Sequence, residues 1–397
     1  MIALMALTFS AAAAPLIIDH TCVNLYTNLT SADIARVKTM WADLLGASHS
    51  LGYRVGCQLL QSNVDSRFQV NVTDSGDMEG PTTNHLRISR AIRNFTYNSW
   101  NYGGDEQTWY TSVPDVALTQ ANIAYCNSNH LGLSVFGLAW SWQMCWHNIN
   151  STPIDTQYQV RWCGSSVGGP DGDLAWGLSS QSYPVTSNHV SVDTYLQATE
   201  QYRDFCKSNG YQTVIIFTTA PPDYYGGAAY QAYLKNNYIR NYVAHTSDGI
   251  LFDYADILCW DNAGHRATND WTDLAGNPQI YEWFADDNYL NLDGSDTSNP
   301  YHIGERGAIR VAKALWYMLA IIAQKDSAIT AAIAPRPADS AALNWTSYLG
   351  QNYSILYSTN LVNWEVLASN LVATPPANTY TSYFGNSKHS FFRIQKQ

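Results

Sequence analysis

Two short segments far apart in the chain carry the residue types of nucleophilic catalysis. The first is Gly46-Ala-Ser-His-Ser-Leu-Gly52, which contains Ser50, and the second is Asn299-Pro-Tyr-His302. A serine hydroxyl becomes a nucleophile when a base accepts its proton, and histidine suits that role because its charge changes near neutral pH. Gly52 gives the turn the flexibility to expose the hydroxyl and backbone N–H groups. Each segment alone also fits a polar loop or a helix start, so the prediction rests on the pair.

Other acidic residues suggest two further kinds of site. Asp253, Asp256 and Asp261 follow one apolar run and could supply the paired carboxylates of a glycoside hydrolase. The loop from Asp286 to Asp296 is rich in oxygen ligands, but it misses the residue register of a calcium loop, so a solvated acidic loop is favoured. No cysteine or histidine pair has a zinc-binding spacing. The sequence therefore predicts no metal and no other cofactor.

A sheet is expected to position these residues, because short apolar runs alternate with amphipathic stretches. Three runs are nearly continuous, as in strands buried on both sheet faces: residues 133–140, 213–219 and 249–253. Three stretches show helical periodicity: residues 192–207, 228–244 and 303–323. This alternation predicts a doubly wound α/β fold, whose ligands bind beyond the carboxyl ends of the strands.

A further helix is expected near the N-terminus. Ser31 can cap it, Asp33 lies in its first turn, and Ile34, Val37 and Trp41 share one face. The residues that follow, 44–47, are interpreted as the end of a strand. This places the serine cluster directly after a strand.

Several segments together make the chain similar to the SGNH (GDSL-like) hydrolase superfamily, and most of all to a secreted bacterial branch of it. They are residues 49–52, 237–242, 250–257, 302–307 and 314–320. The likeness spans residues 16–325, and the order and spacing of the segments make it specific. It implies a three-layer α/β/α flavodoxin-like parallel sheet for that part of the chain.

The resemblance also implies catalytic roles. Ser50 corresponds to the nucleophile that attacks an ester carbonyl, and its N–H to part of the oxyanion hole; His302 corresponds to the base. The family usually has an aspartate three residues before that histidine, where this chain has Asn299, and an amide cannot stabilise imidazolium as a carboxylate does. Asp296 or Asp293, in the preceding loop, are the substitutes expected for it.

The oxyanion donors depart from the family pattern as well. The family's oxyanion glycine and its Gly-x-Asn-Asp block are not recognisable. Gly52, Ser141, Trp142, Thr219 and nearby backbone amides are the candidates that remain for oxyanion and substrate binding. One such donor is typically worth about 10²- to 10³-fold in rate.

The C-terminal part has a different composition. Alanine, proline and small polar residues mark a linker at 326–340, after which helical periodicity is absent. Short strands are predicted at residues 343–345, 353–357, 364–367, 379–381 and 391–394. Residues 341–397 therefore form a predicted small β sandwich, and the phrase at 357–364 resembles a fibronectin-like module of secreted bacterial enzymes.

The remaining features favour export. Residues 1–14 end in small residues like a secretory signal peptide, although a basic start is missing, and the mature domain is predicted to begin at residue 15. Seven cysteines fit an oxidising compartment with disulfides, and six Asn-x-Ser/Thr sequons are compatible with glycosylation. No later apolar run predicts a membrane span. The net charge of -11, without a basic cluster, argues against nucleic acid.

The sequence thus predicts a secreted or cell-surface serine esterase. Its expected substrate is an ester, with an acylated polysaccharide favoured because 14 Trp and 27 Tyr offer rings that stack on sugars. The β module is expected to attach the protein to a cell surface or to itself. The alternative is a catalytically degenerate SGNH-fold protein that serves as an extracellular binding or structural component.

Overall fold

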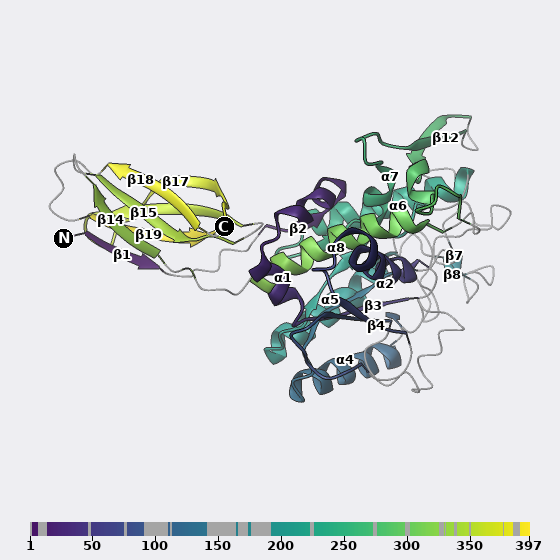
Figure 1. Cartoon of the computed structure of the whole chain (residues 1–397), viewed down its shortest axis with the longest axis horizontal. Coiled ribbons are helices and arrows are strands. Elements are labelled where there is room, and N and C mark those ends of the chain that lie inside the picture. Colours follow the sequence, from purple (N-terminus) through teal and green to yellow (C-terminus); the bar gives the residue numbers. More distant parts are fainter. Residues whose placement is uncertain are drawn as a thin grey trace. The chain divides into compact units, whose positions relative to one another are not determined.

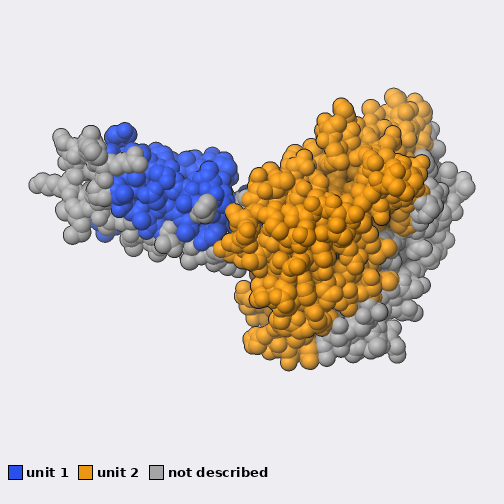
Figure 2. All heavy atoms as spheres, in the orientation of Figure 1, with its two compact units in different colours: residues 1–14, 319–397 blue, residues 15–318 orange. Residues whose placement is uncertain are grey.

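The computed structural model describes residues 2–6, 14–46, 49–74, 78–90, 110–111, 113–140, 164–165, 174–175, 192–222, 226–272, 276–297, 302–324, 329, 331–336, 340–348, 351–375, 377–383 and 390–397. The chain divides into two compact units (Figure 2). One unit is Pro15–Met318, and the other joins Met1–Ala14 to Leu319–Gln397. The first holds an α/β fold and the second a pair of β-sheets.

A parallel sheet forms the centre of the larger unit (Figure 1). Its strands are β2 (Leu16–Ile18), β3 (Trp41–Leu45), β4 (Val70–Thr73), β5 (Leu86–Ser89), β6 (Leu133–Leu138), β9 (Val214–Ile215), β10 (Phe217–Thr218) and β11 (Ile250–Phe252). They pair in the orders β4-β5-β3-β6-β9 and β10-β11-β2, and every pair is parallel. Only Ile216 separates β9 from β10, so the two groups continue through one interrupted strand. The carboxyl ends of the strands therefore share one edge.

Helices cover both faces of this sheet. They are α1 (Ser31–Val37), α2 (Ser50–Leu59), α4 (Val113–Ser128), α5 (Val192–Asn209), α6 (Gly226–Ala244), α7 (Tyr254–Cys259) and α8 (Glu305–Gln324), with the helical turns η1 (His20–Asn28), η2 (Leu60–Val64) and η4 (Asp286–Tyr289). On β3, Trp41 and Leu45 enter one core with residues of α4, α5 and α6. Ala42 and Leu44 alternate to the other face and are equally buried, as expected of a strand covered on both sides.

Close backbone packing joins α2 to α8. A Cβ atom added at Gly56 would lie 2.0 Å from the carbonyl oxygen of Ala308. Phe68, shortly after η2, packs edge-on against Trp316 of α8 at 5.0 Å between ring centroids. The helix that begins with Ser50 is thereby held against the helix that follows His302.

Two smaller antiparallel pairs complete the larger unit. They are β7 (Gly164–Ser165) with β8 (Leu174–Ala175), and the hairpin of β12 (Thr268–Thr272) and β13 (Pro278–Glu282). The hairpin packs on α6 through an aromatic cluster that includes Tyr230, Trp271 and Tyr281. It also brings Glu282 to the carboxyl edge of the sheet.

The first helix differs from its prediction at both ends. Thr30, not Ser31, is the N-cap, because the Thr30 side chain accepts from the Asp33 N–H while Asp33 accepts from the Thr30 N–H. The helix ends at Val37, and Trp41 belongs to β3. The apolar spacing of Val37 and Trp41 thus spans a helix and a strand, and both side chains are buried.

Among the described helices, α8 is long and apolar enough to cross a membrane by length and composition, and 89% of its apolar window is buried inside the structure. Buried core helices of soluble proteins can have the same length and composition. The absence of a membrane span therefore stays a prediction from sequence.

The smaller unit contains two β-sheets that share a core. Its strands are β1 (Ile2–Ala6), β14 (Ala331–Arg336), β15 (Ser340–Thr346), β16 (Asn352–Ser358), β17 (Glu365–Val372), β18 (Ala377–Tyr383) and β19 (Ser390–Lys396). The sheets have the orders β14-β15-β18 and β1-β19-β16-β17. Leu343, Trp345, Tyr353, Ile355 and Phe392 meet between them. Four of the five strands predicted in this region lie within β15, β16, β18 and β19, and the fifth, 364–367, begins one residue before β17.

Two segments of this unit bear on the predicted domain boundaries. Residues 331–336, within the predicted linker, form β14, which pairs with β15. Ile2–Ala6, within the predicted signal peptide, form β1, which runs parallel to β19. The pairing belongs to the chain before any cleavage, so removal of residues 1–14 stays a prediction.

Candidate active site

Ser50 is the first residue of α2, directly after the turn that leaves β3. Its side chain is fully buried, and its hydroxyl donates to the carbonyl oxygen of Gly46 at 2.5 Å. Arg54, one turn along α2, donates to the Ser50 hydroxyl at 3.2 Å and forms an ion pair with Asp74. The strand-turn-helix setting is the one predicted for a nucleophile, but the hydroxyl points into this turn.

Both glycines of the serine segment lie in close packing. Gly46 has a φ of +141°, and a Cβ there would lie 3.0 Å from the carbonyl oxygen of Trp140, two residues after β6. Gly52 is helical, and its Cβ would lie 2.8 Å from Ile303 and 3.2 Å from the Tyr254 hydroxyl. Gly52 therefore lets the segment before α8 approach α2, which is a different role from the exposed flexible turn expected of it.

His302 lies beside the serine segment. Its ring stacks on that of His49, with centroids 5.0 Å apart and planes at 10°. His49 is almost fully buried, its Nδ1 lies 3.3 Å from the Tyr254 hydroxyl, and Phe284 stacks on it at 6.1 Å. The fold thus brings the two predicted catalytic segments, about 250 residues apart in sequence, into contact through His49.

The other predicted site residues fall in three groups. Asn299, Ser141 and Trp142 lie outside the described residues, so their roles stay predictions. Asp296 is exposed and forms a short β-bridge with Leu290. Thr219 is buried; its hydroxyl donates to Asp253 at 2.9 Å and accepts from the Ala255 N–H. Thr219 therefore supports the end of β11.

The carboxylates considered for a glycoside hydrolase each have a basic partner. Asp253 accepts two hydrogen bonds from Arg240, at 2.5 and 2.9 Å. Asp256 pairs with His20, and Asp261 pairs with His265. In the loop considered for calcium, Asp287 pairs with Arg306. Each of these carboxylates is therefore paired with a basic side chain of the protein.

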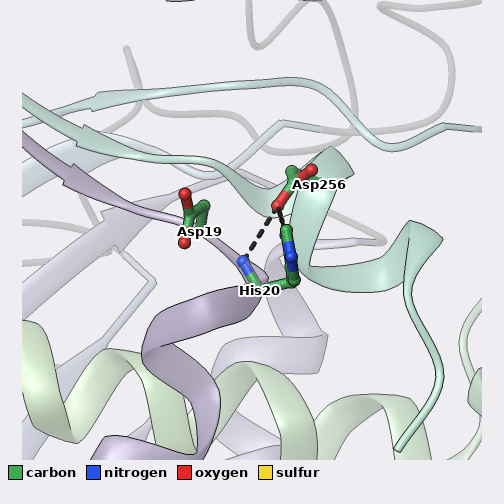
Figure 3. A group of neighbouring side chains, drawn as sticks. All are labelled: Asp19, His20 and Asp256. Atoms are coloured by element: carbon green, nitrogen blue, oxygen red, sulfur yellow. Dashed lines mark hydrogen bonds and ion pairs between the residues drawn. The ribbon is translucent and has the colours of Figure 1, made fainter. Parts of the chain in front are cut away.

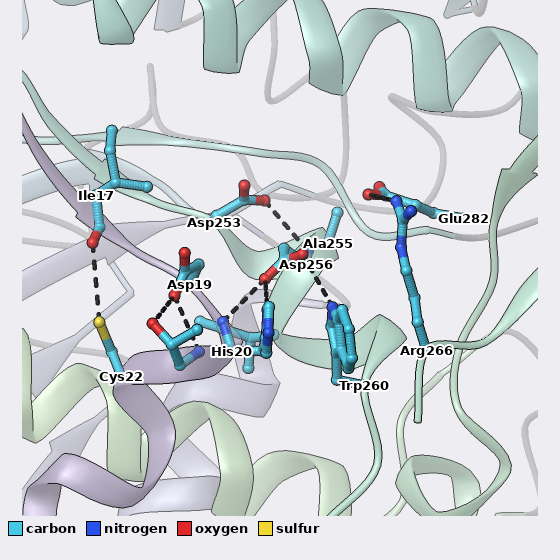
Figure 4. A network of polar contacts seen from close by, with 12 residues as sticks. Ile17, Asp19, His20, Cys22, Asp253, Ala255, Asp256, Trp260, Arg266 and Glu282 are labelled. Atoms are coloured by element: carbon cyan, nitrogen blue, oxygen red, sulfur yellow. Dashed lines mark hydrogen bonds and ion pairs between the residues drawn. The ribbon is translucent and has the colours of Figure 1, made fainter. Parts of the chain in front are cut away.

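A buried ionic network connects β11 to the hairpin. Arg240 on α6 bridges Asp253 and Glu282, with contacts of 2.8 and 3.0 Å to the latter. Arg266 also donates to Glu282 at 2.9 Å, and Figure 4 shows these two side chains together with Asp253. Burial alone would lower the pKa of Arg240, but the two carboxylates raise it well above its ordinary value. Burial raises the pKa of Glu282 despite the lowering effect of Arg240. The network holds the hairpin against the sheet edge.

Sequence reasoning missed a second group at the same edge, formed by His20 and Asp256 (Figure 3). His20 follows β2, and Asp256 lies in the first turn of α7 after β11, the strand next to β2. One oxygen of Asp256 accepts from the His20 N–H at 2.9 Å and contacts His20 Nδ1 at 2.5 Å. The indole N–H of Trp260 donates to the other oxygen at 3.2 Å. The apolar run at 16–18 before Asp19 and His20 was the signal that could have located them.

Asp19, His20 and Asp256 also have the composition of a metal site. One potential ligand atom from each lies within 4.8 Å of the others. However, His20 Nδ1 and Asp256 already face each other at hydrogen-bonding distance, and Asp19 accepts from the N–H and hydroxyl of Thr21. The geometry is that of a hydrogen-bonded acid–base pair beside a capping carboxylate.

Replacing Asp256 by asparagine is expected to destabilise the protein near neutral pH but much less in acid. Burial alone would raise the pKa of Asp256, but hydrogen bonds from the His20 N–H and ring hold it below its ordinary value. Such a carboxyl stabilises the fold above its unfolded pKa of about 4, and that contribution is lost as the pH falls through the folded pKa. Urea unfolding of wild type and variant at about pH 7 and about pH 3 checks this; an equal difference at both pH values would contradict it.

The cysteines leave the disulfide prediction open. Cys22, Cys57, Cys126, Cys206 and Cys259 are buried thiols in the structure. Cys145 and Cys163 lie outside the described residues. Burial raises the pKa of Cys57 to about 12, so this thiol is unreactive near neutral pH.

The comparisons with known proteins do not place this chain in a family. No family model and no curated protein matches the chain. One solved structure with a partial match is described as "Structure of a Paenibacillus Polymyxa Xyloglucanase from Glycoside Hydrolase Family 44", at a TM-score of 0.20 and 9% identity. The match covers 76% of this chain and 52% of that chain, so this chain spans about half of its length. A TM-score this low carries no argument about fold or function.

Proposed function

We propose that the α/β unit is a secreted hydrolase of the SGNH type that cleaves esters on a polysaccharide. The strand order supports this assignment. The strands β5, β3, β6, β9/β10 and β11 lie in that order across the sheet, and numbering them by their position in the chain gives the flavodoxin-like order 2-1-3-4-5. The strands β4 and β2 extend the sheet at its two ends.

The contact of His302 with the serine segment is the observation that carries the proposal. Ser50 starts the helix after β3, which is strand 1 of the 2-1-3-4-5 order, and His302 precedes the last helix of the unit. The stacked rings of His49 and His302 bring these two positions together at the edge where doubly wound sheets bind ligands. During catalysis the Ser50 hydroxyl leaves the Gly46 carbonyl and turns towards His302.

The β unit supports an extracellular role for the protein. Its two sheets and shared core agree with the proposed fibronectin-like module. In this proposal the module attaches the enzyme to a cell surface or spaces it from its substrate.

A second candidate function is a catalytically degenerate protein that binds at the cell surface. The buried Ser50 hydroxyl, which donates to Gly46, favours it. The amide at Asn299 and the unrecognisable oxyanion blocks point the same way.

A fluorophosphonate probe separates the two functions, because it labels only an activated serine. We expect the wild type to label at Ser50 and the Ser50→Ala variant to remain unlabelled. Ser62→Ala is the matched control, since Ser62 is an exposed serine of η2 whose hydroxyl donates to the Gln58 carbonyl near the end of α2. Absence of label in the folded wild type would support the degenerate protein, and labelling at Ser48 would move the nucleophile to that residue.

A further inference from the structure

The carboxyl ends of β2 and β11 carry polar groups that the proposed ester cleavage does not use. We call Asp19, His20, Asp256 and Trp260 the His20 site. We propose that the His20 site binds two neighbouring hydroxyl groups of a neutral sugar. The choice of a sugar rests on the proposed function. Figure 4 shows the contacts of the His20 site with its neighbours at the ends of β2 and β11.

His20 presents a fixed hydrogen-bond acceptor. The ionised carboxylate of Asp256 only accepts hydrogen bonds, so the matching His20 tautomer donates from Nδ1 and has its lone pair on Nε2. The side chain is 25% exposed, and no described residue forms a hydrogen bond with Nε2. A ligand hydroxyl can therefore donate to Nε2 without displacing a protein group.

Trp260 holds the ring in this orientation. Its indole lies on the His20 ring, with centroids 3.9 Å apart and planes at 13°, while its N–H donates to Asp256. The stack and the two hydrogen bonds from His20 to Asp256 remove the ring's rotational freedom before a ligand arrives. Binding then costs less conformational entropy, as in other preorganised sites.

Asp19 supplies a second acceptor. Its Oδ1 accepts from Thr21, and its other oxygen has no hydrogen bond within the described part of the chain. One potential ligand atom of each of Asp19, His20 and Asp256 lies within 4.8 Å of the others. The Asp19 carboxylate and the His20 ring are therefore close enough for one sugar ring to reach both with hydrogen bonds of about 2.8 Å.

The charge of these acceptors disfavours an anion, and their small number disfavours a metal ion. Two carboxylates repel an anion. Both oxygens of Asp256 already accept hydrogen bonds from His20 or Trp260. A metal that left these bonds intact would find only Asp19 and His20 Nε2, fewer than the roughly four ligands of zinc or six of calcium. Two acceptors without a donor instead match the hydroxyls of a neutral sugar.

Isothermal titration of the Ser50→Ala protein with neutral oligosaccharides of glucose, xylose and mannose tests the proposal without hydrolysis. We expect His20→Phe, which keeps the stack on Trp260 but lacks Nε2, to weaken binding about tenfold or more. Asp19→Asn keeps a side chain able to cap η1 and is expected to weaken binding several-fold. His265→Phe is the control, because His265 is an exposed histidine paired with Asp261. Circular dichroism verifies folding of each variant.

Each outcome decides the inference. Binding that His20→Phe and Asp19→Asn weaken, while His265→Phe does not, supports it. Equal affinity in all variants, or no heat with any of the sugars up to about 10 mM, overturns it, as does Zn²⁺ or Ca²⁺ binding that depends on His20 in the absence of sugar binding. Ester cleavage by the wild-type protein is measured separately. If no sugar binds but the ester is cleaved, only the His20 site is wrong. If the ester is not cleaved, the titration still shows whether the His20 site binds sugars.

Discussion

Replacing Ser50 by alanine is expected to lower kcat/KM for an activated ester by about 10⁴-fold or more, to the level of the oxyanion site alone. The physical reason is that the variant loses the nucleophile while keeping the α2 helix that presents its backbone N–H. The measurement is hydrolysis of p-nitrophenyl acetate by equal amounts of folded wild type and variant. A residual rate within a factor of about ten of the wild type would exclude Ser50 as the nucleophile.

Two further variants make that result specific. His302→Gln is expected to reduce the rate as severely, because a serine without its base is a weak nucleophile, and the two losses should not add when combined. Ser62→Ala is expected to retain full activity. If Ser48→Ala loses most of its kcat/KM while Ser50→Ala stays active, the protein is an esterase but its nucleophile is Ser48.

Replacing Arg240 by alanine is expected to destabilise the larger unit by about 3–5 kcal/mol, the cost of leaving a buried pair without its partner. Asp253 and Glu282 are each at most 4% exposed, and both bond to this guanidinium. Without Arg240, two buried carboxylates would face each other, with Arg266 remaining for one of them. Urea unfolding near neutral pH measures the loss.

The control for this prediction is an exposed pair of the same chemistry. Arg67 bonds to Asp65, but its side chain is 55% exposed, so Arg67→Ala is expected to change stability by less than about 1 kcal/mol. Similar losses in the two variants would show that burial of the network adds little. If Arg240→Ala does not fold, Arg240→Lys, which keeps the charge but loses the bidentate geometry, gives an intermediate value.

Much of the α/β fold is predictable because strand and helix patterns are local. The apolar runs at 213–219 and 249–253 contain β9/β10 and β11. The periodic stretch at 303–323 corresponds to α8. Prediction failed where a short helix is followed closely by a buried strand. Val37 and Trp41 have helical spacing, but the chain leaves the helix between them, and both side chains are buried. A periodicity cannot distinguish one helix face from a helix and a strand that pack together.

The candidate site was predictable only in part. The order of Ser50 and His302 was visible in the sequence, whereas the stack of His49 on His302 and the packing role of Gly52 depend on how α2 approaches the segment before α8. The acidic residues after β11 were noticed as carboxylates, but their partners Arg240 and His20 come from α6 and from the end of β2. Such partners are distant in sequence, so no local spacing indicates them.

The sequence by itself therefore determined an α/β unit followed by a β unit, with Ser50 early and His302 late. These features follow from local apolar patterning and from residue order. Only the tertiary structure decided that His49 joins the two candidate catalytic segments, that the Ser50 hydroxyl donates to the Gly46 carbonyl, and that His20 and Asp256 meet at the ends of adjacent strands. Strand β2 pairs with β11, the last strand of the sheet in chain order. This long-range pairing brings His20 into hydrogen-bonding distance of Asp256, which lies 236 positions further along the chain.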